Sequence, residues 1–215
     1  MKRRTILILS AVAVAIAVGI AFAATTLLRS GPVVAEANGV PIHRSELDRR
    51  LSTLTSMHGG AVTDPQQWRE MALQSLVDDI IIEQEAERVG IDVSAKDVDA
   101  EFDSMQSKFD SPKEFKAWME NLGLDRRELK RRIRLQLVGS LVFAEIVKDV
   151  SVSDDEIAAY YEAHKGDFGD QPLLEVKNDI RDQLEKDRKE QAYRSWLEEQ
   201  RASVTLVRHD DGAQP

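Results

Sequence analysis

Helix-start signals recur along this chain and constrain its fold more than any other sequence feature. A capping box places a small polar residue at the helix N-cap and an acidic residue or Gln three positions later, so that each satisfies a backbone N–H of the first turn. Each signal here is followed by apolar residues at intervals of three and four, the period of a helix with one buried face. The pattern predicts helices that begin after Asp64, Ser94, Ser111, Asp125 and Ser153.

The ends and apolar stripes of the longer helices are also readable. The helix after Asp64 is expected to run to Val89, because Gly90 followed by an apolar residue is typical of a helix C-terminus. A further helix is predicted over residues 173–201, with a polar interruption at 185–191. The helix after Asp125 is expected to reach about Lys148 and to bury one stripe made of Leu129, Ile133, Leu137, Leu141 and Ala144.

Strands are predicted only at the two ends of this helical region. The Asn-Gly dipeptide at 38–39 lies between short apolar segments, and both residues tolerate the positive φ of a type I′ hairpin turn. Pro41 lacks an N–H, so its strand is expected at a sheet edge. The β-branched segment 203–207 would leave its backbone unpaired, so we expect it to pair with the hairpin. The predicted fold is mainly α with a small antiparallel sheet joining the chain ends, and residues 208–215 are expected to be a disordered tail.

The first thirty residues have the character of an export signal. Lys2, Arg3 and Arg4 precede an uncharged run of 24 residues, 5–28. As a helix this run is about 36 Å long, enough for a hydrocarbon core of about 30 Å. The basic cluster predicts that the N-terminus stays inside and the rest lies outside. An A-x-A pattern at 21–23 also permits cleavage, so a membrane anchor and a cleaved signal peptide both remain open, and either predicts an extracytoplasmic protein.

Composition excludes several classes of function. The chain has no cysteine, which excludes disulfides, thiolate zinc sites and cysteine nucleophiles. Its net charge is −9 although the first thirty residues carry only basic charges, so nucleic-acid binding, which depends on Lys and Arg, is not expected. No phosphate-binding loop or nucleophile elbow is present, and no metal or cofactor is predicted. Ligand spacing is also absent among the histidines, which are His43, His58, His164 and His209. The sequence predicts a protein that is not an enzyme.

Four segments, in order, resemble the SurA/PrsA family of extracytoplasmic chaperones. They are V-A-E-A-N-G-V-P-I-H-R-S-E-L at 34–47, L-V-D-D-I-I-I-E-Q-E-A-E-R-V-G-I-D-V-S at 76–94, L-G-L-D-R-R-E-L-K-R-R-I-R at 122–134 and V-S-V-S-D-D-E-I-A-A-Y-Y-E-A-H-K-G-D-F at 150–168. The resemblance covers about residues 33–207, and in that family the C-terminal segment returns to the N-terminal domain. It implies a SurA N-terminal-like helical domain over 31–207 that binds unfolded or newly exported polypeptides without ATP.

One departure from the family pattern bears on catalysis. In family members that are prolyl isomerases, a parvulin domain follows the phenylalanine of the Y-Y…F segment. Here only residues 169–172 separate Phe168 from the predicted terminal helix, whereas a domain needs about 50 residues or more. The resemblance therefore implies a holdase without isomerase activity. A membrane-tethered structural or assembly module with one dedicated cell-envelope partner is the alternative, and a homodimer is left open.

Two groups of side chains are candidates for binding. Methionine adapts its shape to varied partners, so an apolar client-binding groove is predicted, with core packing as the alternative, for Met57, Met71, Phe102, Met105, Phe109, Phe115, Trp118 and Met119. A basic patch that could contact acidic clients or anionic lipid headgroups, or simply pair with acids of neighbouring helices, consists of Arg126, Arg127, Lys130, Arg131, Arg132 and Arg134.

Overall fold

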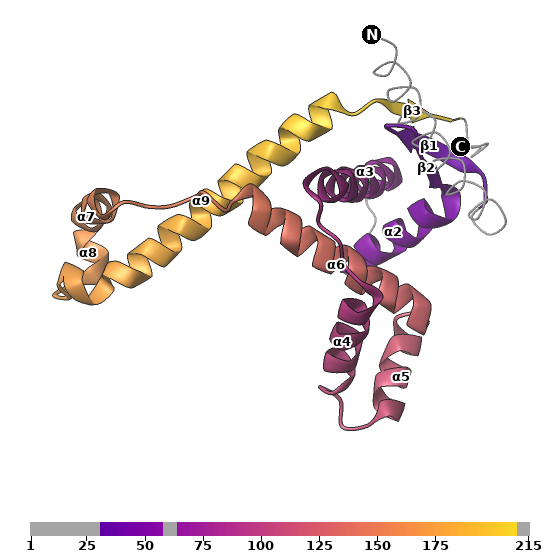
Figure 1. The fold of residues 1–215 in the computed structure, drawn as a ribbon, viewed down its shortest axis with the longest axis horizontal. Coiled ribbons are helices and arrows are strands. Elements are labelled where there is room, and N and C mark those ends of the chain that lie inside the picture. The colour runs from indigo at the N-terminus through magenta and orange to yellow at the C-terminus, as the bar shows by residue number, and fades with distance from the viewer. Residues whose placement is uncertain (1–30, 58–63, 210–215) are drawn as a thin grey trace, which may run out of the picture. The chain divides into compact units, whose positions relative to one another are not determined.

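The computed structural model describes residues 31–57 and 64–209, and most of them are helical (Figure 1). The elements are β1 Val33–Ala37, β2 Val40–His43, α2 Arg44–Met57, α3 Pro65–Val89, α4 Ala95–Gln106, α5 Pro112–Asn121, α6 Arg126–Ile146, α7 Asp154–Ala163, α8 Lys165–Phe168, α9 Leu173–Ser203 and β3 Leu206–Arg208. The predicted mainly α fold with a small antiparallel sheet is confirmed. The predicted anchor or signal peptide at 1–30 lies outside the described residues. Among the helices of 31–57 and 64–209, none is long and apolar enough to cross a membrane.

The chain divides into two compact units. The first unit runs up to Val77 and resumes at Val204, and it contains the sheet, α2 and the first half of α3. The second unit, from Asp78 to Ser203, contains the rest of α3 and the helices α4 to α9.

The sheet of the first unit has the strand order β2-β1-β3, with both pairs antiparallel. Asn38 and Gly39 adopt φ values of 50° and 79°, as the predicted hairpin turn requires. Pro41 lies in an edge strand, as expected from its missing N–H. Strand β3 pairs with β1 so that Val207 lies opposite Glu36. The predicted pairing of the chain's two ends is therefore confirmed.

The C-terminal strand lies at 206–208 instead of the predicted 203–207, because α9 continues to Ser203. Asn38 fixes where the pairing begins: its N–H donates to the carbonyl of Thr205 (2.9 Å), and its Oδ1 accepts the Thr205 N–H (3.0 Å). Arg208 and His209 were expected in a disordered tail, but the His209 N–H donates to the Val34 carbonyl (3.0 Å) and Arg208 is part of β3. Arg208 is therefore part of the sheet and His209 is hydrogen-bonded to it, and residues 210–215 lie outside the described part of the chain.

Helix termini follow the predicted signals closely. Complete reciprocal capping boxes form at Ser94 and at Ser153. At Ser111 and Asp125 the N-cap side chain accepts the N–H of the third helical residue, which is half of the predicted box. Helix α3 ends at Val89 and is followed by Gly90 (φ 77°), and the Ile91 N–H donates to the carbonyl of Ala86 (2.8 Å), as in a Schellman motif.

The second unit holds two apolar clusters. The larger one joins α4, α5 and α6 with the segments before them, and its buried residues are Ala86, Val93, Val98, Phe102, Phe115, Met119, Leu124, Leu129, Ile133, Val138 and Val142. The smaller one belongs to α7 and α9, which pack together, and consists of Val152, Ile157, Tyr161, Val176 and Ile180.

The buried stripe of α6 differs from the predicted one. Leu129 and Ile133 are buried as expected, but the stripe does not continue through Leu141, which is 46% exposed. Val138 and Val142 are buried instead. Val138 lies nine residues after Leu129, about two and a half turns, and therefore on the opposite side of the helix. The prediction of one continuous stripe was wrong because the two halves of α6 bury different faces.

Candidate functional site

Aromatic side chains gather around α4, α5 and the turn between them. The Phe115 ring lies edge-on to Phe102 (5.3 Å between centroids) and contacts Phe109 (5.1 Å). Trp118 stacks on Phe115 (5.6 Å) and contacts Phe109 (5.3 Å). Met105 and Met119 belong to the same apolar cluster, so the structure brings together six of the eight residues predicted to bind clients.

Burial separates the six residues into two sets. Phe102 and Phe115 are 1% and 2% exposed, and Met119 is 9% exposed, so these three fill the core. The other three are only partly buried and pack against the outside of the cluster. We call them the outer row: Met105, Phe109 and Trp118.

A hollow in the surface adjoins the outer row at the turn between α4 and α5. Phe109 contributes the aromatic side of the hollow, and two carboxylates contribute its charge. The lining residues are Asp103, Gln106, Ser107, Phe109, Asp110, Ser111 and Pro112. Of the outer row, Phe109 is therefore the residue that lines this hollow.

The remaining two predicted residues belong to the first unit. Met71 is 43% exposed on α3. The side chain of Met57 lies outside the described part of the chain. Several exposed apolar side chains were not among the residues predicted to bind clients, namely Leu122, Leu141, Leu174, Leu206 and Val207. The only signal for the last two was the apolar strand pattern at the C-terminus.

The predicted basic patch on α6 is largely paired. The Arg126 guanidinium lies over the Phe102 ring, 4.4 Å from its centroid. Glu128 accepts from both Arg131 and Arg132, at 2.8 and 3.3 Å. The other pairs are Lys130 with Asp99 and Arg134 with Glu83. These contacts correspond to the second interpretation of the patch, in which its cations pair with acids of the same helix and of neighbouring helices. Contact of the patch with clients or lipid stays a prediction.

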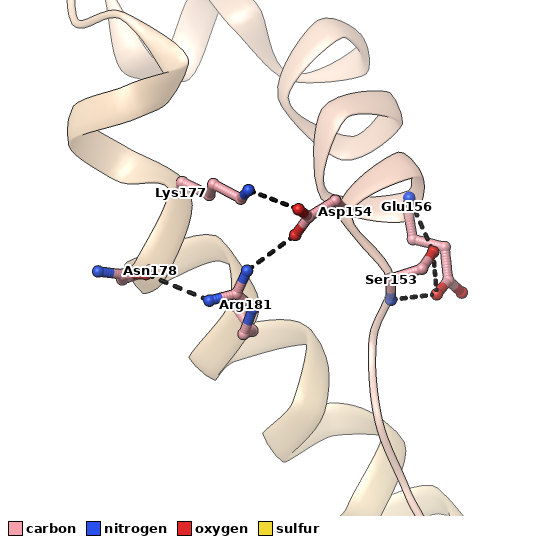
Figure 2. Close-up of polar contacts among 6 residues, drawn as sticks. All are labelled: Ser153, Asp154, Glu156, Lys177, Asn178 and Arg181. Atoms are coloured by element: carbon pink, nitrogen blue, oxygen red, sulfur yellow. Dashed lines mark hydrogen bonds and ion pairs between the residues drawn. The ribbon is translucent and has the colours of Figure 1, made fainter.

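A set of ion pairs fastens the start of α7 to α9 (Figure 2). Asp154 lies between two cations of α9, with Oδ2 2.7 Å from Lys177 Nζ and Oδ1 2.9 Å from an Arg181 Nη. Hydrogen bonds from Lys177 and Arg181 lower the pKa of the Asp154 carboxyl. Glu156 closes the capping box with Ser153, and Arg188 of α9 also binds it. The Arg188 hydrogen bond, followed by those from Ser153, lowers the pKa of Glu156 to about 2.

The far end of this helical hairpin is closed by α8 and a four-residue connection. Phe168 of α8 stacks on Tyr161 with ring centroids 5.4 Å apart. The Tyr161 hydroxyl donates to the carbonyl of Gln171 at 2.7 Å. Residues 169–172 then lead directly into α9, so α7, α8 and α9 follow one another without an intervening domain.

The histidines have local structural contacts. His43 is 6% exposed and its Nδ1 lies 3.0 Å from the Gly31 carbonyl. His164 stacks on Tyr160, and His209 Nε2 lies 3.0 Å from Glu36 Oε1. His58 lies outside the described residues. Within 31–57 and 64–209 no group of His, Asp and Glu could hold a metal ion.

Comparison with known protein families identifies the family of this chain. The profile described as the SurA-like N-terminal domain matches residues 1–142. The chain belongs to the SurA-like N-terminal domain family. The resemblance read from the four sequence segments is thereby confirmed.

The curated relatives of this family member are foldases. It is 27% identical over 146 residues to the foldase protein PrsA of Clostridium acetobutylicum, a match that covers 61% of this chain and 44% of the relative. It is 30% identical over 154 residues to the foldase protein PrsA of Clostridium perfringens, covering 63% of this chain and 43% of the relative. The chain therefore spans less than half the length of the curated relatives it matches.

Among solved structures, the chain is similar to one from a study of two SurA-like chaperones of Campylobacter jejuni, PEB4 and Cj1289. The TM-score is 0.61, the sequence identity is 12%, and the match covers 83% of this chain and 99% of the other. At this identity the likeness establishes the shared fold.

Proposed function

We propose that this protein is an ATP-independent extracytoplasmic chaperone that holds unfolded or newly exported polypeptides and does not catalyse prolyl isomerisation. The observation that carries the proposal is the partly buried outer row of Met105, Phe109 and Trp118, of which Phe109 lines a surface hollow. It occurs in a SurA-like family member whose relatives are named foldases.

The energetics of such a surface favour weak and reversible binding. Apolar area removed from water contributes about 25 cal/mol per Å², and ordering an extended client offsets much of that gain. Release then needs no nucleotide, which agrees with a sequence that lacks a phosphate-binding loop. Methionine beside two aromatic rings adapts to clients of varied shape.

The absence of isomerase activity is supported by the connection between α8 and α9. Residues 169–172 join the two helices directly, and the Tyr161–Gln171 hydrogen bond closes the end of the hairpin. The expected result is that the purified protein does not accelerate X-Pro isomerisation in a proline-containing peptide. A protein-dependent rate that survives repurification would contradict this part of the proposal.

Extracytoplasmic location is supported by the basic cluster Lys2, Arg3 and Arg4 before the uncharged run of 24 residues. A reporter fused after Pro215 is expected to be active only outside the cytoplasm. Activity of a cytoplasmic reporter at the same position would contradict it.

Aggregation assays test the holding function. The full chain is expected to suppress the aggregation of several unrelated unfolded proteins, whereas a module with one dedicated partner would suppress none. The double variant Met105→Ser, Phe109→Ser should lose most of this protection while keeping its helical circular dichroism. The matched control is Leu141→Ser, which removes a 46% exposed leucine from α6 and should retain protection. Equal protection by both variants would show that clients bind elsewhere.

A further inference from the structure

The two edges of the small sheet differ in what they offer to another strand. An antiparallel strand points alternate backbone groups toward its neighbour and away from it. On the β2 side, Pro41 lies opposite Glu36, whose backbone groups face β3, so by alternation the residues of β2 that face outward are Pro41 and His43. Pro41 has no N–H, and the His43 N–H donates to Glu46 Oε2 at 3.0 Å. This edge therefore presents no unpaired N–H at either position.

The β3 edge is open. The Thr205 carbonyl and the His209 N–H bond to β1, so by alternation Val207 faces Glu36 while Leu206 and Arg208 point their backbone groups away from β1. Each of these two residues presents one N–H and one C=O. No other described residue hydrogen-bonds to these outward groups, and all three residues of β3 are exposed.

The side chains along this edge are compatible with an apolar strand beside them. Leu206 is 36% exposed and Val207 is 45% exposed, and in a strand they lie on opposite faces. The Arg208 guanidinium already pairs with Glu70 of α3, with Nη2 2.7 Å from Oε2. A strand added at this edge would therefore have an apolar neighbour on each face of the sheet, Leu206 on one and Val207 on the other. The charge of Arg208 would already be balanced by Glu70.

We propose that the β3 edge binds an extended segment of a client polypeptide as a fourth strand of the sheet. The proposal rests on the chaperone function proposed above and names how one part of the client is recognised. Backbone hydrogen bonds supply binding in this mode whatever the client sequence, which suits a protein that holds many clients. A second copy of this chain is disfavoured as the occupant, because a three-residue strand offers far less than the roughly 1,200–2,000 Å² that a stable protein interface buries.

Amide hydrogen exchange on the full chain tests the proposal directly. The probe is a short peptide of alternating Val and Thr, flanked by Lys for solubility. At about ten times its Kd, exchange of the Leu206 and Arg208 amides should slow by about tenfold, while that of Val207, which faces β1, should change little. The same peptide with every central amide N-methylated should give no protection, because it cannot donate to β3.

A pair of substitutions at one position separates the backbone donor from the side chain. Leu206→Pro removes an outward N–H and should weaken peptide binding by about tenfold or more, whereas Leu206→Ala keeps the N–H and should bind within a few-fold of the parent. The exchange experiment on the unaltered chain decides the matter if the proline variant misfolds.

The outcomes distinguish this proposal from the chaperone function on which it rests. Suppressed aggregation without peptide protection of Leu206 and Arg208 overturns the edge proposal and leaves the holding function standing. Failure of both assays overturns both. Protection that appears without peptide and grows with protein concentration means that a second copy occupies the edge, and it too overturns the proposal.

Discussion

Replacing Ile157 with alanine tests whether the α7–α9 hairpin is held by its own small core. Ile157 is 0% exposed and belongs to the cluster of five buried residues between the two helices. The substitution removes three carbon atoms. At about 0.8 kcal/mol for each buried CH₂, the lost transfer free energy is roughly 2.4 kcal/mol. A residual cavity adds to this cost, within the range of about 2–5 kcal/mol typical of such substitutions.

The lost stability should appear first as local unfolding of the α7–α9 hairpin, because every buried residue of this cluster lies within residues 152–180. A change of about 2.4 kcal/mol corresponds to amide exchange that is roughly 60-fold faster in α7, since about 1.4 kcal/mol is a factor of ten. The amides of α4 and α5, whose core is the separate larger cluster, should change little. Aggregation suppression should also persist, because the outer row lies on α4, α5 and the turn between them.

The matched control is Leu174→Ala, which removes a similar apolar mass from a site that is 86% exposed. This control should stay within about 0.5 kcal/mol of the parent. The reasoning is refuted if Ile157→Ala leaves α7 exchange unchanged, or if exchange accelerates equally in α4, α5 and α7.

Three further predictions concern the larger cluster, the hairpin ion pairs and the sheet. Phe102→Ala should lower the free energy of unfolding by about 3–5 kcal/mol in chemical denaturation, whereas Phe102→Leu should cost markedly less, and equal costs would contradict the core placement. Because the pKa of Glu156 is lowered from its usual 4.5 to about 2, its contribution to stability is complete above about pH 4.5 and is lost as the pH falls through 2. Amide hydrogen exchange in α7 should therefore accelerate as the pH falls from about 4.5 to about 2. An equal acceleration in the Glu156→Gln variant would show that Glu156 is not the group responsible. Deletion of residues 204–215 removes β3 and should lower Tm by at least about 2–4 °C, the shift for 1 kcal/mol at this chain length; deletion of 210–215 is the control and should leave Tm unchanged.

Many local features agree with their prediction because the residues that determine them are close together in the sequence. A capping box such as Ser94 with Asp97 is complete within one helical turn, so the residues that make it are adjacent in the sequence. The turn at Asn38 and Gly39 is likewise set by the φ preferences of its own residues. Pairing of β3 with β1 was also predictable, because an unpaired strand has few other partners in so helical a chain.

The candidate site was only partly predictable. The sequence singled out the methionine and aromatic residues of α4 and α5, but their spacing is the same for a core and for a binding surface. Packing against α6 buries Phe102 and leaves Phe109 at the margin. The basic residues of α6 likewise form a patch in the sequence, and acids far along the chain, Glu83 and Asp99, pair with two of them.

The amino-acid sequence encodes the local structures, namely where the helices begin and where the hairpin turns, and it also indicates that the two ends of the chain pair. Which side of each helix is buried depends instead on tertiary packing. Helix α6 illustrates the difference, since it buries Leu129 near one end and Val138 on the opposite side further along. Its first half packs on α4, where Arg126 lies over the Phe102 ring, and its second half meets α9, where Phe143 contacts Tyr193 at 5.2 Å. Helix caps and turns depend on residues a few positions apart, whereas the buried face of a helix depends on neighbours that are distant in the chain.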